Sequence, residues 1–272
     1  MMALSNTASR LFGKFAHCAF PTPVQRLINK IYAMIFKIDL SDFAPLQTYP
    51  TLNALFTREL KTPRPLNQTP NALLSPCDGV LKECGLVQEG QVLQIKGMPY
   101  LVGALLGSPL EESYRYFNLY LSPRDYHRFH APCDLEVLET RYFSGLLFPV
   151  NESALKKHPH LFVCNERVVI VAKDPRGALL YFVAVGALNV GQIVLNFDST
   201  LHTNAPRNPP LSIKHYDPPI ALAKGAELGR FEMGSTIVLF VRECSMPPET
   251  LWHQARYGEF LSTLHPIGAK DA

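Results

Sequence analysis

The sequence predicts an α+β protein, with N-terminal amphipathic helices followed by a largely antiparallel β core. Apolar residues recur at helical spacing in the first 60 residues, and short β-rich runs separated by Gly, Pro and Asn fill residues 73–241. The chain of 272 residues is 47% hydrophobic and shows no internal repeat, so one large core is sufficient. We therefore expect a helical segment over residues 1–40 and a single domain over residues 41–272.

An amphipathic helix is predicted over residues 24–38, directly after an aromatic and basic stretch at residues 10–20. Its apolar residues share one face and its polar residues the other. Such a helix lies either in a membrane interface or against the protein's own core, and its periodicity alone leaves both open. The apolar positions are Val24, Leu27, Ile28, Ile31, Ile35 and Ile38.

A second helix is predicted over residues 51–60, and the prolines at 63, 65 and 70 would end it. Beyond it, four runs rich in β-branched and aromatic residues predict strands of the core. These runs are residues 114–121, 167–173, 179–185 and 235–241. The proline-rich stretch 206–219 is predicted to be a loop of the kind that often borders a site.

Composition excludes some classes of function. A charged fraction of 18% and a net charge of +3 argue against a nucleic-acid partner. Six cysteines without a CxxC pair are expected to be reduced thiols. No run approaches the roughly 18 apolar residues of a membrane-spanning helix. Arg10, Lys14 and His17 interrupt the only candidate signal-peptide core, so we expect the protein to stay on the cytoplasmic side.

In three segments, reactive side chains stand close to the Gly and Pro residues that favour turns. These segments are SPCDGV at 75–80, YLSPRDYHRFHAPCD at 120–134 and GRFEMGSTIVLF at 229–240. Each has an ordinary structural interpretation, respectively a turn, a pair of partly buried histidines and a bulge that opens a strand. Together, Asp78, His127, His130 and Ser235 have the residue types of an activated nucleophile with its base and orienting group. The residue types alone do not decide between the two interpretations.

Further segments, LQIKGMPY, LFPVNE, CNERV and VGALNVG, accompany the histidine segment DYHRFHAPCD and the segment GRFEMGST. In their order and approximate spacing they resemble the bacterial, pyruvoyl-dependent phosphatidylserine decarboxylases, and the resemblance runs over nearly the whole chain. Met233 departs from the Leu of the family's Leu-Gly-Ser-Thr cleavage motif, which is a volume-conserving change. Ser144 and Leu146 stand where other members often have Pro and Asp.

The resemblance implies that Asp78, His130 and Ser235 form a charge relay for self-cleavage. His130 would take the hydroxyl proton of Ser235, Asp78 would fix the imidazole tautomer, and Ser235 would attack the carbonyl of Gly234. Elimination from the resulting ester, followed by hydrolysis, would leave a pyruvoyl group at position 235 as the cofactor. The chains 1–234 and 235–272 would stay associated, because the shorter one begins with an apolar strand.

The resemblance further implies that the pyruvoyl group forms a Schiff base with phosphatidylserine, releases CO2 and yields phosphatidylethanolamine for phospholipid biosynthesis. His127 would donate the proton to the substrate carbon. No metal and no nucleic acid are expected, and a homodimer is left open. A lipid substrate favours residues 1–40 as a peripheral membrane-interface segment on the cytoplasmic side of the inner membrane, with residues 41–272 as the catalytic domain.

Three other functions stay open at this point. A serine hydrolase would use Asp78, His130 and Ser235 on an external substrate without self-cleavage, although a GxSxG elbow is missing. A lipoyl-like or membrane-binding module would present residues 233–235 on a turn. Both predict an intact chain. The ligands of a metal enzyme would be His127, His130, Asp78 and Cys133.

Overall fold

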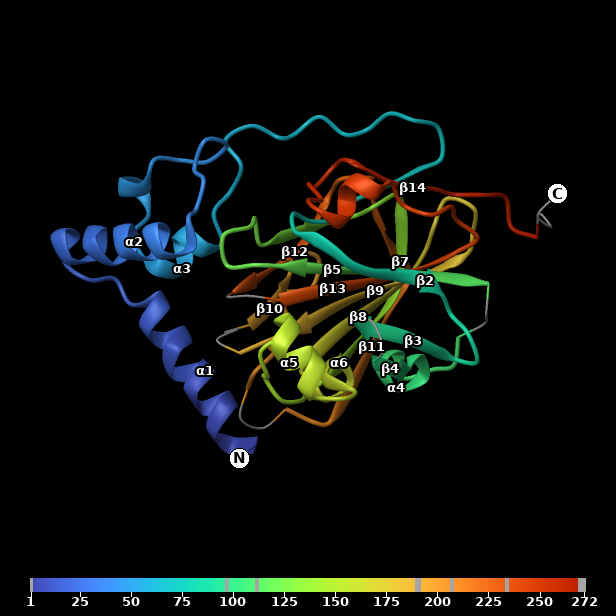
Figure 1. Ribbon diagram of the computed structural model, residues 1–272, viewed down its shortest axis with the longest axis horizontal. Helices are drawn as coiled ribbons and strands as arrows, with labels where there is room; N and C mark the ends of the chain where they lie inside the picture. The colour runs from blue at the N-terminus through green and yellow to red at the C-terminus, as the bar shows by residue number, and fades with distance from the viewer. Residues whose placement is uncertain are drawn as a thin grey trace.

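The computed structural model describes residues 2–95, 98–110, 113–188, 192–205, 208–232 and 235–268. Helices gather in the N-terminal part and antiparallel strands form most of the remainder (Figure 1). The predicted α+β class is confirmed. Met233 and Gly234, which precede the predicted cleavage point, lie outside the described residues, and only the main chain of Ser235 is described.

A seven-stranded antiparallel sheet forms the centre of the molecule, in the order β11-β7-β8-β9-β13-β5-β2. Its middle strands are buried on both faces, which explains why their sequences are continuous apolar runs. All four predicted strand runs lie in this sheet. The strands are β2 (Val80–Leu86), β5 (Tyr114–Leu121), β7 (Leu135–Phe143), β8 (Arg167–Lys173), β9 (Leu179–Gly186), β11 (Leu211–Leu222) and β13 (Ser235–Arg242).

One face of this sheet is covered by a three-stranded sheet, β10-β12-β6, and by the two-stranded ribbon β1-β14. Phe129 of the small sheet packs on Phe182 of the large one, with ring centroids 5.4 Å apart. This layer carries the histidine segment and the strand that leads to Ser235. Its strands are β1 (Ala72–Leu74), β6 (Arg128–His130), β10 (Gln192–Leu195), β12 (Glu227–Glu232) and β14 (Phe260–Thr263).

The opposite face is covered by short helices and one hairpin, which form a second apolar core with the sheet. Arg167 joins two of the helices, because its guanidinium donates to the carbonyls of Ala104, Leu105 and Val163 near their C-terminal ends. Burial lowers the pKa of Arg167 to about 10. The elements are β3 (Gln91–Ile95), β4 (Met98–Leu101), α4 (Val102–Leu106), α5 (Glu152–Lys157) and α6 (Leu161–Cys164).

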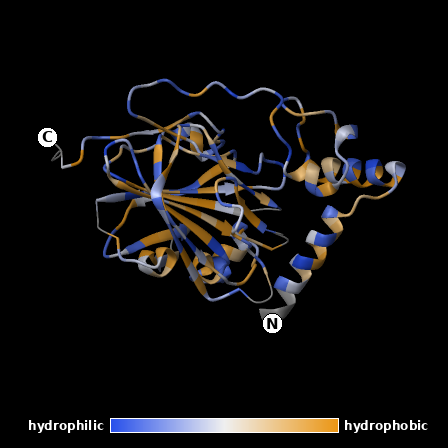
Figure 2. Cartoon of the chain, turned by 180° about the vertical axis from the view of Figure 1, so that it is seen from behind, coloured by the Kyte–Doolittle hydropathy of each residue, from blue (hydrophilic) through white to orange (hydrophobic). Residues whose placement is uncertain are grey.

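The N-terminal helices project to one side of the β core (Figure 2). They pack on one another around Ala16, Leu52 and Leu55. Among the described residues, no helix is both long enough and apolar enough to cross a bilayer. All six cysteines are described and unpaired, as expected. The helical elements are α1 (Met2–His17), α2 (Thr22–Phe36), η1 (Leu46–Thr48), α3 (Leu52–Phe56) and, near the C-terminus, η2 (Glu249–Trp252).

Helix α2 confirms the predicted amphipathic helix, but two of its polar residues face the protein. Gln25 and Asn29 are buried, the amide of Gln25 donating to Asn29 at 2.8 Å and that of Asn29 to the carbonyl of Tyr49 at 3.0 Å. On the opposite face, Leu27 and Ile35 are 57% and 66% exposed. Burial against the protein's own core, one of the two interpretations left open, therefore does not apply to most of the apolar face.

The predicted helix over residues 51–60 is too long. Helix α3 starts where the Thr51 hydroxyl accepts from the amide of Ala54, and it ends at Phe56. The guanidinium of Arg58 then donates to the carbonyls of Arg124 and Asp125. Tertiary hydrogen bonds thus end the helix before the prolines do.

The predicted proline-rich loop is also wrong for most of its length. Residues 211–222 form β11, and residues 206 and 207 lie outside the described part of the chain. β11 is an edge strand whose register shifts between His215 and Ile220, and its two prolines lie within that shift. Proline is tolerated at such edges and bulges, because no ladder hydrogen bond requires its missing N–H.

Candidate active site

The predicted cleavage point lies at the start of a central strand. The main chain of Ser235 begins β13, where it pairs with Leu121 of β5 on one side and with Gly186 of β9 on the other. β12 ends at Glu232, so residues 233 and 234 join the two strands. Position 235 is therefore fixed by backbone ladders on both sides, and a chain end formed there would remain anchored in the sheet.

His127 is fully buried and has one ring nitrogen without a partner. Its ring lies on Phe56 of α3, with centroids 3.9 Å apart, and its Nδ1 lies 2.8 Å from the carbonyl oxygen of Asp125. A carbonyl only accepts, so Nδ1 carries the hydrogen and Nε2 is a free acceptor. Among the described residues Nε2 has no hydrogen-bond partner. Burial is the main cause that lowers the pKa of His127 to about 3.

The two histidines of the motif lie at opposite ends of β12. The carbonyl of His127 accepts from the amide of Phe231, one residue before the end of β12, at 2.9 Å. His130 instead pairs with Glu227 at the beginning of β12. A strand rises about 3.3 Å per residue, so the main chain of His130 lies roughly 10 Å farther from the cleavage point. His127 is the histidine closer to position 235.

His130 is held at both ring nitrogens. Its Nδ1 donates to the carbonyl of Gly225 at 3.0 Å, and its Nε2 lies 3.1 Å from the hydroxyl of Tyr126. The carbonyl of Gly225, and not Asp78, is thus the group that fixes the tautomer. Burial lowers the pKa of His130 to about 4, and the charges of Glu227 and Asp78 oppose this shift. His130 and Asp78 therefore interact electrostatically without a direct hydrogen bond.

Asp78 lies in a polar cavity of about 300 Å³ that opens beside the N-terminal helices. Its Oδ1 accepts from Nη1 of Arg64 at 2.6 Å and from the amide of Tyr257 at 2.9 Å. Arg64 also pairs with Asp42 at 3.1 Å. The Asp78 carboxylate is thus already engaged by a cation, and no hydrogen bond joins it directly to His130. The side chain of Ser235, the third member of the predicted relay, lies outside the described part of the chain.

The structure adds residues that the sequence did not single out. Arg64 and Tyr257 hold Asp78, while Tyr126 contacts His130. Asp125 positions His127 through its carbonyl. Its partly buried carboxyl, whose pKa is raised mainly by desolvation, accepts from the amide and the hydroxyl of Ser122. Asp125 and Tyr126 lie within the histidine segment, which was a sequence signal for both, whereas Arg64 and Tyr257 lie in unremarkable stretches.

The proposed metal ligands do not gather. Among the described residues, no group of three or more His, Cys, Asp or Glu side chains is arranged to hold a metal ion. The described arrangement of Asp78, His127, His130 and Cys133 therefore lends no support to a metal centre.

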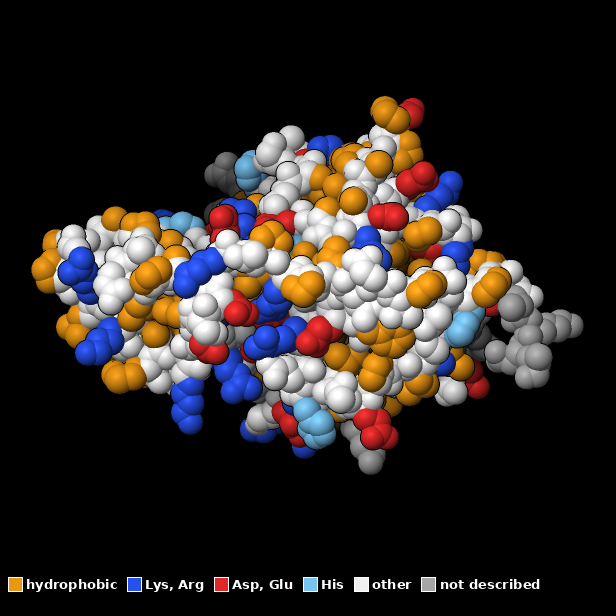
Figure 3. Space-filling model, turned by 90° about the horizontal axis from the view of Figure 1, so that it is seen from above, with side chains coloured by type: hydrophobic (Ala, Val, Ile, Leu, Met, Phe, Trp, Pro, Cys, Tyr) orange, Lys and Arg blue, Asp and Glu red, His pale blue; other side chains and the backbone are white. Residues whose placement is uncertain are grey.

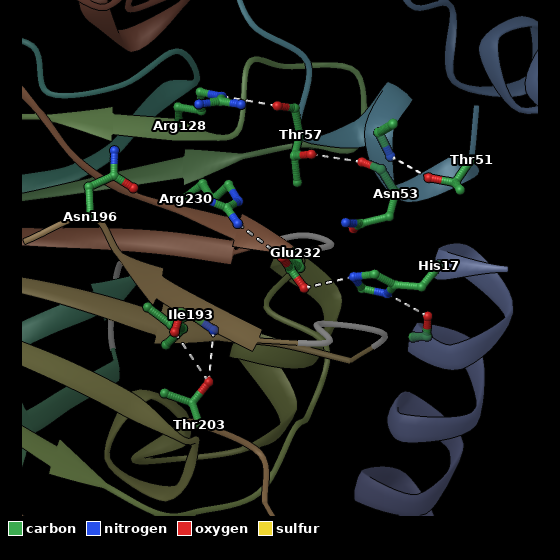
Figure 4. A network of polar contacts seen from close by, with 12 residues as sticks. His17, Thr51, Asn53, Thr57, Arg128, Ile193, Asn196, Thr203, Arg230 and Glu232 are labelled. Carbon is green, nitrogen blue, oxygen red and sulfur yellow. Dashed lines mark hydrogen bonds and ion pairs between the residues drawn. The ribbon is translucent and has the colours of Figure 1, made fainter. Parts of the chain in front are cut away.

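An ion pair links the first helix to the strand that leads into the cleavage segment (Figure 4). Nε2 of His17 lies 3.2 Å from the carboxylate of Glu232, the last residue of β12. Nδ1 of His17 donates to the carbonyl of Gly13 at 2.8 Å. Both ring nitrogens of His17 therefore have a polar partner. The N-terminal helices thus contact both sides of the site, through His17 and through Phe56.

Comparison with known proteins is consistent with this geometry. The phosphatidylserine decarboxylase family model matches residues 52–259. A phosphatidylserine decarboxylase proenzyme of Helicobacter pylori strain Shi470 is 52% identical over 267 residues, 97% of this chain and 99% of the relative. The proenzyme of Campylobacter jejuni is 41% identical over 247 residues, 88% of this chain and 91% of the relative. The chain therefore belongs to the phosphatidylserine decarboxylase family.

Proposed function

We propose that this protein is a phosphatidylserine decarboxylase that cleaves itself between Gly234 and Ser235 and converts Ser235 into a pyruvoyl group. Family membership supports the activity. The observation that carries the site is Nε2 of His127, which is buried and has no hydrogen-bond partner among the described residues. The main chain of His127 contacts β12 near its end, and the next strand, β13, begins at position 235. A buried nitrogen without a partner is costly, and it fits a reactive group placed next to it.

Self-cleavage requires a base for the hydroxyl of Ser235 and a stabilised positive charge on that base. By motif, His130 is the base and Asp78 the charge that stabilises its protonated form. The interaction between their charges supports this role, although the tautomer is fixed by Gly225. After cleavage, the ladders of β13 with β5 and β9 would keep chains 1–234 and 235–272 together.

When formed, the pyruvoyl group supplies an electron sink for the electrons that CO2 leaves behind. The main chain of β13 would hold it, and His127 would move the proton. The substrate amine arrives protonated, and the free Nε2 of His127 can accept that proton and later deliver it to the substrate carbon. The substrate carboxylate, an anion next to a desolvated imidazole, would raise the low pKa of His127 as it binds.

We further propose peripheral attachment to the cytoplasmic face of the inner membrane through residues 1–40, with residues 41–272 as the catalytic domain. The exposed apolar faces of α1 and α2 support this, with basic side chains beside them (Figure 3). Leu11 is 62% and Met34 65% exposed. A soluble protein rarely leaves such contiguous apolar surface uncovered, whereas an interfacial helix requires it. A homodimer stays open.

The test uses purified wild-type protein and Ser235→Ala with phosphatidylserine vesicles, and lipid mass spectrometry of the products. We expect phosphatidylethanolamine from the wild type alone. Conversion by Ser235→Ala would contradict the proposal. Hydrolysis of ester substrates by an intact wild-type chain, with no phosphatidylethanolamine formed, would favour a serine hydrolase instead.

A further inference from the structure

A cavity of about 470 Å³ lies between α1 and the end of β12, next to the cleavage segment. Figure 4 shows its two walls, with His17 of α1 facing Glu232 of β12. The proposed reaction leaves this cavity without a role. Its polar lining comprises Arg10, Lys14, His17, Gln192, His202, Thr203, Asn204 and Glu232.

The cavity carries an excess of positive charge. Its one acidic side chain, Glu232, is already paired with His17 at 3.2 Å and with Arg230 at 3.5 Å. Arg10 donates to the neutral hydroxyl of Thr7 at 3.2 Å. Neither Arg10 nor Lys14 forms an ion pair with any acidic side chain that the structure describes. Two cations are therefore left to attract an anionic group into the cavity.

A nearby carboxylate does not neutralise them. Glu166 is buried behind the cavity wall, where it accepts from the hydroxyl of Tyr142 at 2.6 Å and from the amide of Asn204. The charge of Arg10 acts on Glu166 and lowers its pKa, yet burial outweighs this and raises it. The Oε1 atom of Glu166 is thus occupied by Tyr142 and Asn204, and among the described residues Glu166 forms no ion pair with Arg10.

Helix α1 places this basic lining at the depth of lipid head groups. Arg10, Lys14 and His17 are separated by four and three residues and so share one face of the helix. Leu11 and Phe15, one position farther round, form an adjoining apolar strip that is 62% and 42% exposed. If that strip enters a bilayer, the basic face lies beside it at the level of the phosphates.

The cavity also lies near His127 and position 235, where the reaction is proposed to take place. Gln192 of its lining pairs with Glu232 in the β10-β12 ladder, whereas His127 contacts β12 from the β6 side. The cavity and the free Nε2 of His127 therefore flank the same end of β12. A ligand whose phosphate is held in the cavity could present its amine to position 235, between the cavity and His127.

We propose that this cavity binds the phosphodiester of the lipid head group, with Arg10 and Lys14 as its cationic partners. The inference rests on the proposed decarboxylase function and adds the subsite that orients the substrate. The phosphodiester is common to phosphatidylserine and phosphatidylethanolamine, so this subsite would position the head group and would not distinguish substrate from product.

The test compares Arg10→Gln/Lys14→Gln with wild type and with Lys156→Gln/Lys157→Gln. The control pair is exposed on α5 and loses the same charge. The substrate is dihexanoyl phosphatidylserine below its micellar concentration, so that membrane binding does not enter. We expect self-cleavage in all three proteins, about a tenfold higher KM with little change in kcat for Arg10→Gln/Lys14→Gln, and wild-type values for the control.

A second readout does not depend on turnover. Dihexanoyl phosphatidylglycerol has the phosphodiester and no amine, and its calorimetric Kd should rise about tenfold in Arg10→Gln/Lys14→Gln. Inorganic phosphate should bind much more weakly; equal binding would make the cavity a general anion site and overturn the head-group assignment. An unchanged KM and Kd, or a defect seen only on vesicles, would also overturn it. A wild type that binds phosphatidylglycerol here but never decarboxylates would contradict the proposed function alone.

Discussion

The ring of Tyr257 lies on the imidazole of His130, with centroids 3.6 Å apart and planes inclined by 19°. The amide of the same residue donates to Asp78, and its hydroxyl donates to the carbonyl of Gly225, which also accepts from His130. Tyr257 thus connects the two residues of the proposed relay that do not touch. It belongs to the segment after the proposed cleavage point, so the proposed short chain would help to build the site that releases it.

Removing this ring should slow self-cleavage. In Tyr257→Leu the imidazole of His130 loses its stacked neighbour, and we expect the conversion of precursor to be slowed about tenfold or more. The control Tyr257→Phe keeps the ring and the amide, and its rate should stay within about threefold of wild type. Densitometry of precursor and products on denaturing gels during expression measures the rates. Equal rates in Tyr257→Leu and wild type would show that the stack does not position His130.

The two histidines should separate the two reactions. We expect His130→Ala and Asp78→Asn to remain uncleaved, because each removes a member of the proposed relay. His127→Ala should cleave but decarboxylate at least about a hundredfold more slowly, because its proton carrier is lost. Gel analysis and phosphatidylethanolamine formation give the two readouts. An uncleaved His127→Ala together with a cleaved His130→Ala would reverse the two roles. This outcome needs a direct test, because His127 is the histidine closer to position 235.

Burial of His130 should make stability sensitive to acid. Its pKa falls from 6.5 to about 4 on folding, so the unfolded chain binds a proton between these values that the folded chain does not. The resulting stability is present above pH 6.5 and is lost as the pH falls towards 4. Between pH 7.5 and 5 an uncleaved Ser235→Ala chain should lose about 2 kcal/mol more unfolding free energy than Ser235→Ala/His130→Gln. Urea titrations at the two pH values measure this, and equal losses would mean that His130 titrates normally.

The apolar face of α2 should carry membrane binding. Leu27→Ser/Ile35→Ser removes two exposed side chains that would enter the interface, and vesicle partitioning should fall about a hundredfold. Activity on monomeric short-chain phosphatidylserine should be unchanged. The matched control is Leu86→Ser/Leu101→Ser, two exposed leucines on β2 and β4, which should partition like wild type. Vesicle co-sedimentation decides, and equal partitioning of both variants would contradict this role for α2.

The strands of the core were predictable because burial on both faces leaves long apolar runs in the sequence, as in β8 and β9. The edge strand β11 was not, since its prolines imitate a loop and only its place at the sheet edge makes them tolerable. Periodicity located α2, but it does not say which face meets solvent. Only the hydrogen bonds of Gln25 and Asn29 reveal that these two polar residues face the protein.

The residues of the site likewise include some that the sequence predicts and some that it does not. Asp78, His127, His130 and Ser235 stand in compact motifs and could be selected from the sequence. Tyr257 and Arg64 could not, because their importance depends on contacts across 179 and 14 residues that leave no local pattern. Nε2 of His130 contacts Tyr126, whereas Nε2 of His127 has no partner among the described residues; this contrast is likewise a property of packing.

The most direct test of self-processing is the intact mass of purified wild-type protein under denaturing conditions, compared with Ser235→Ala. The account predicts two wild-type species that divide between Gly234 and Ser235, the smaller one lighter by a single ammonia than an ordinary 235–272 peptide, and one full-length species for Ser235→Ala. A single wild-type chain that stays intact on long incubation in a well-folded sample would contradict the account.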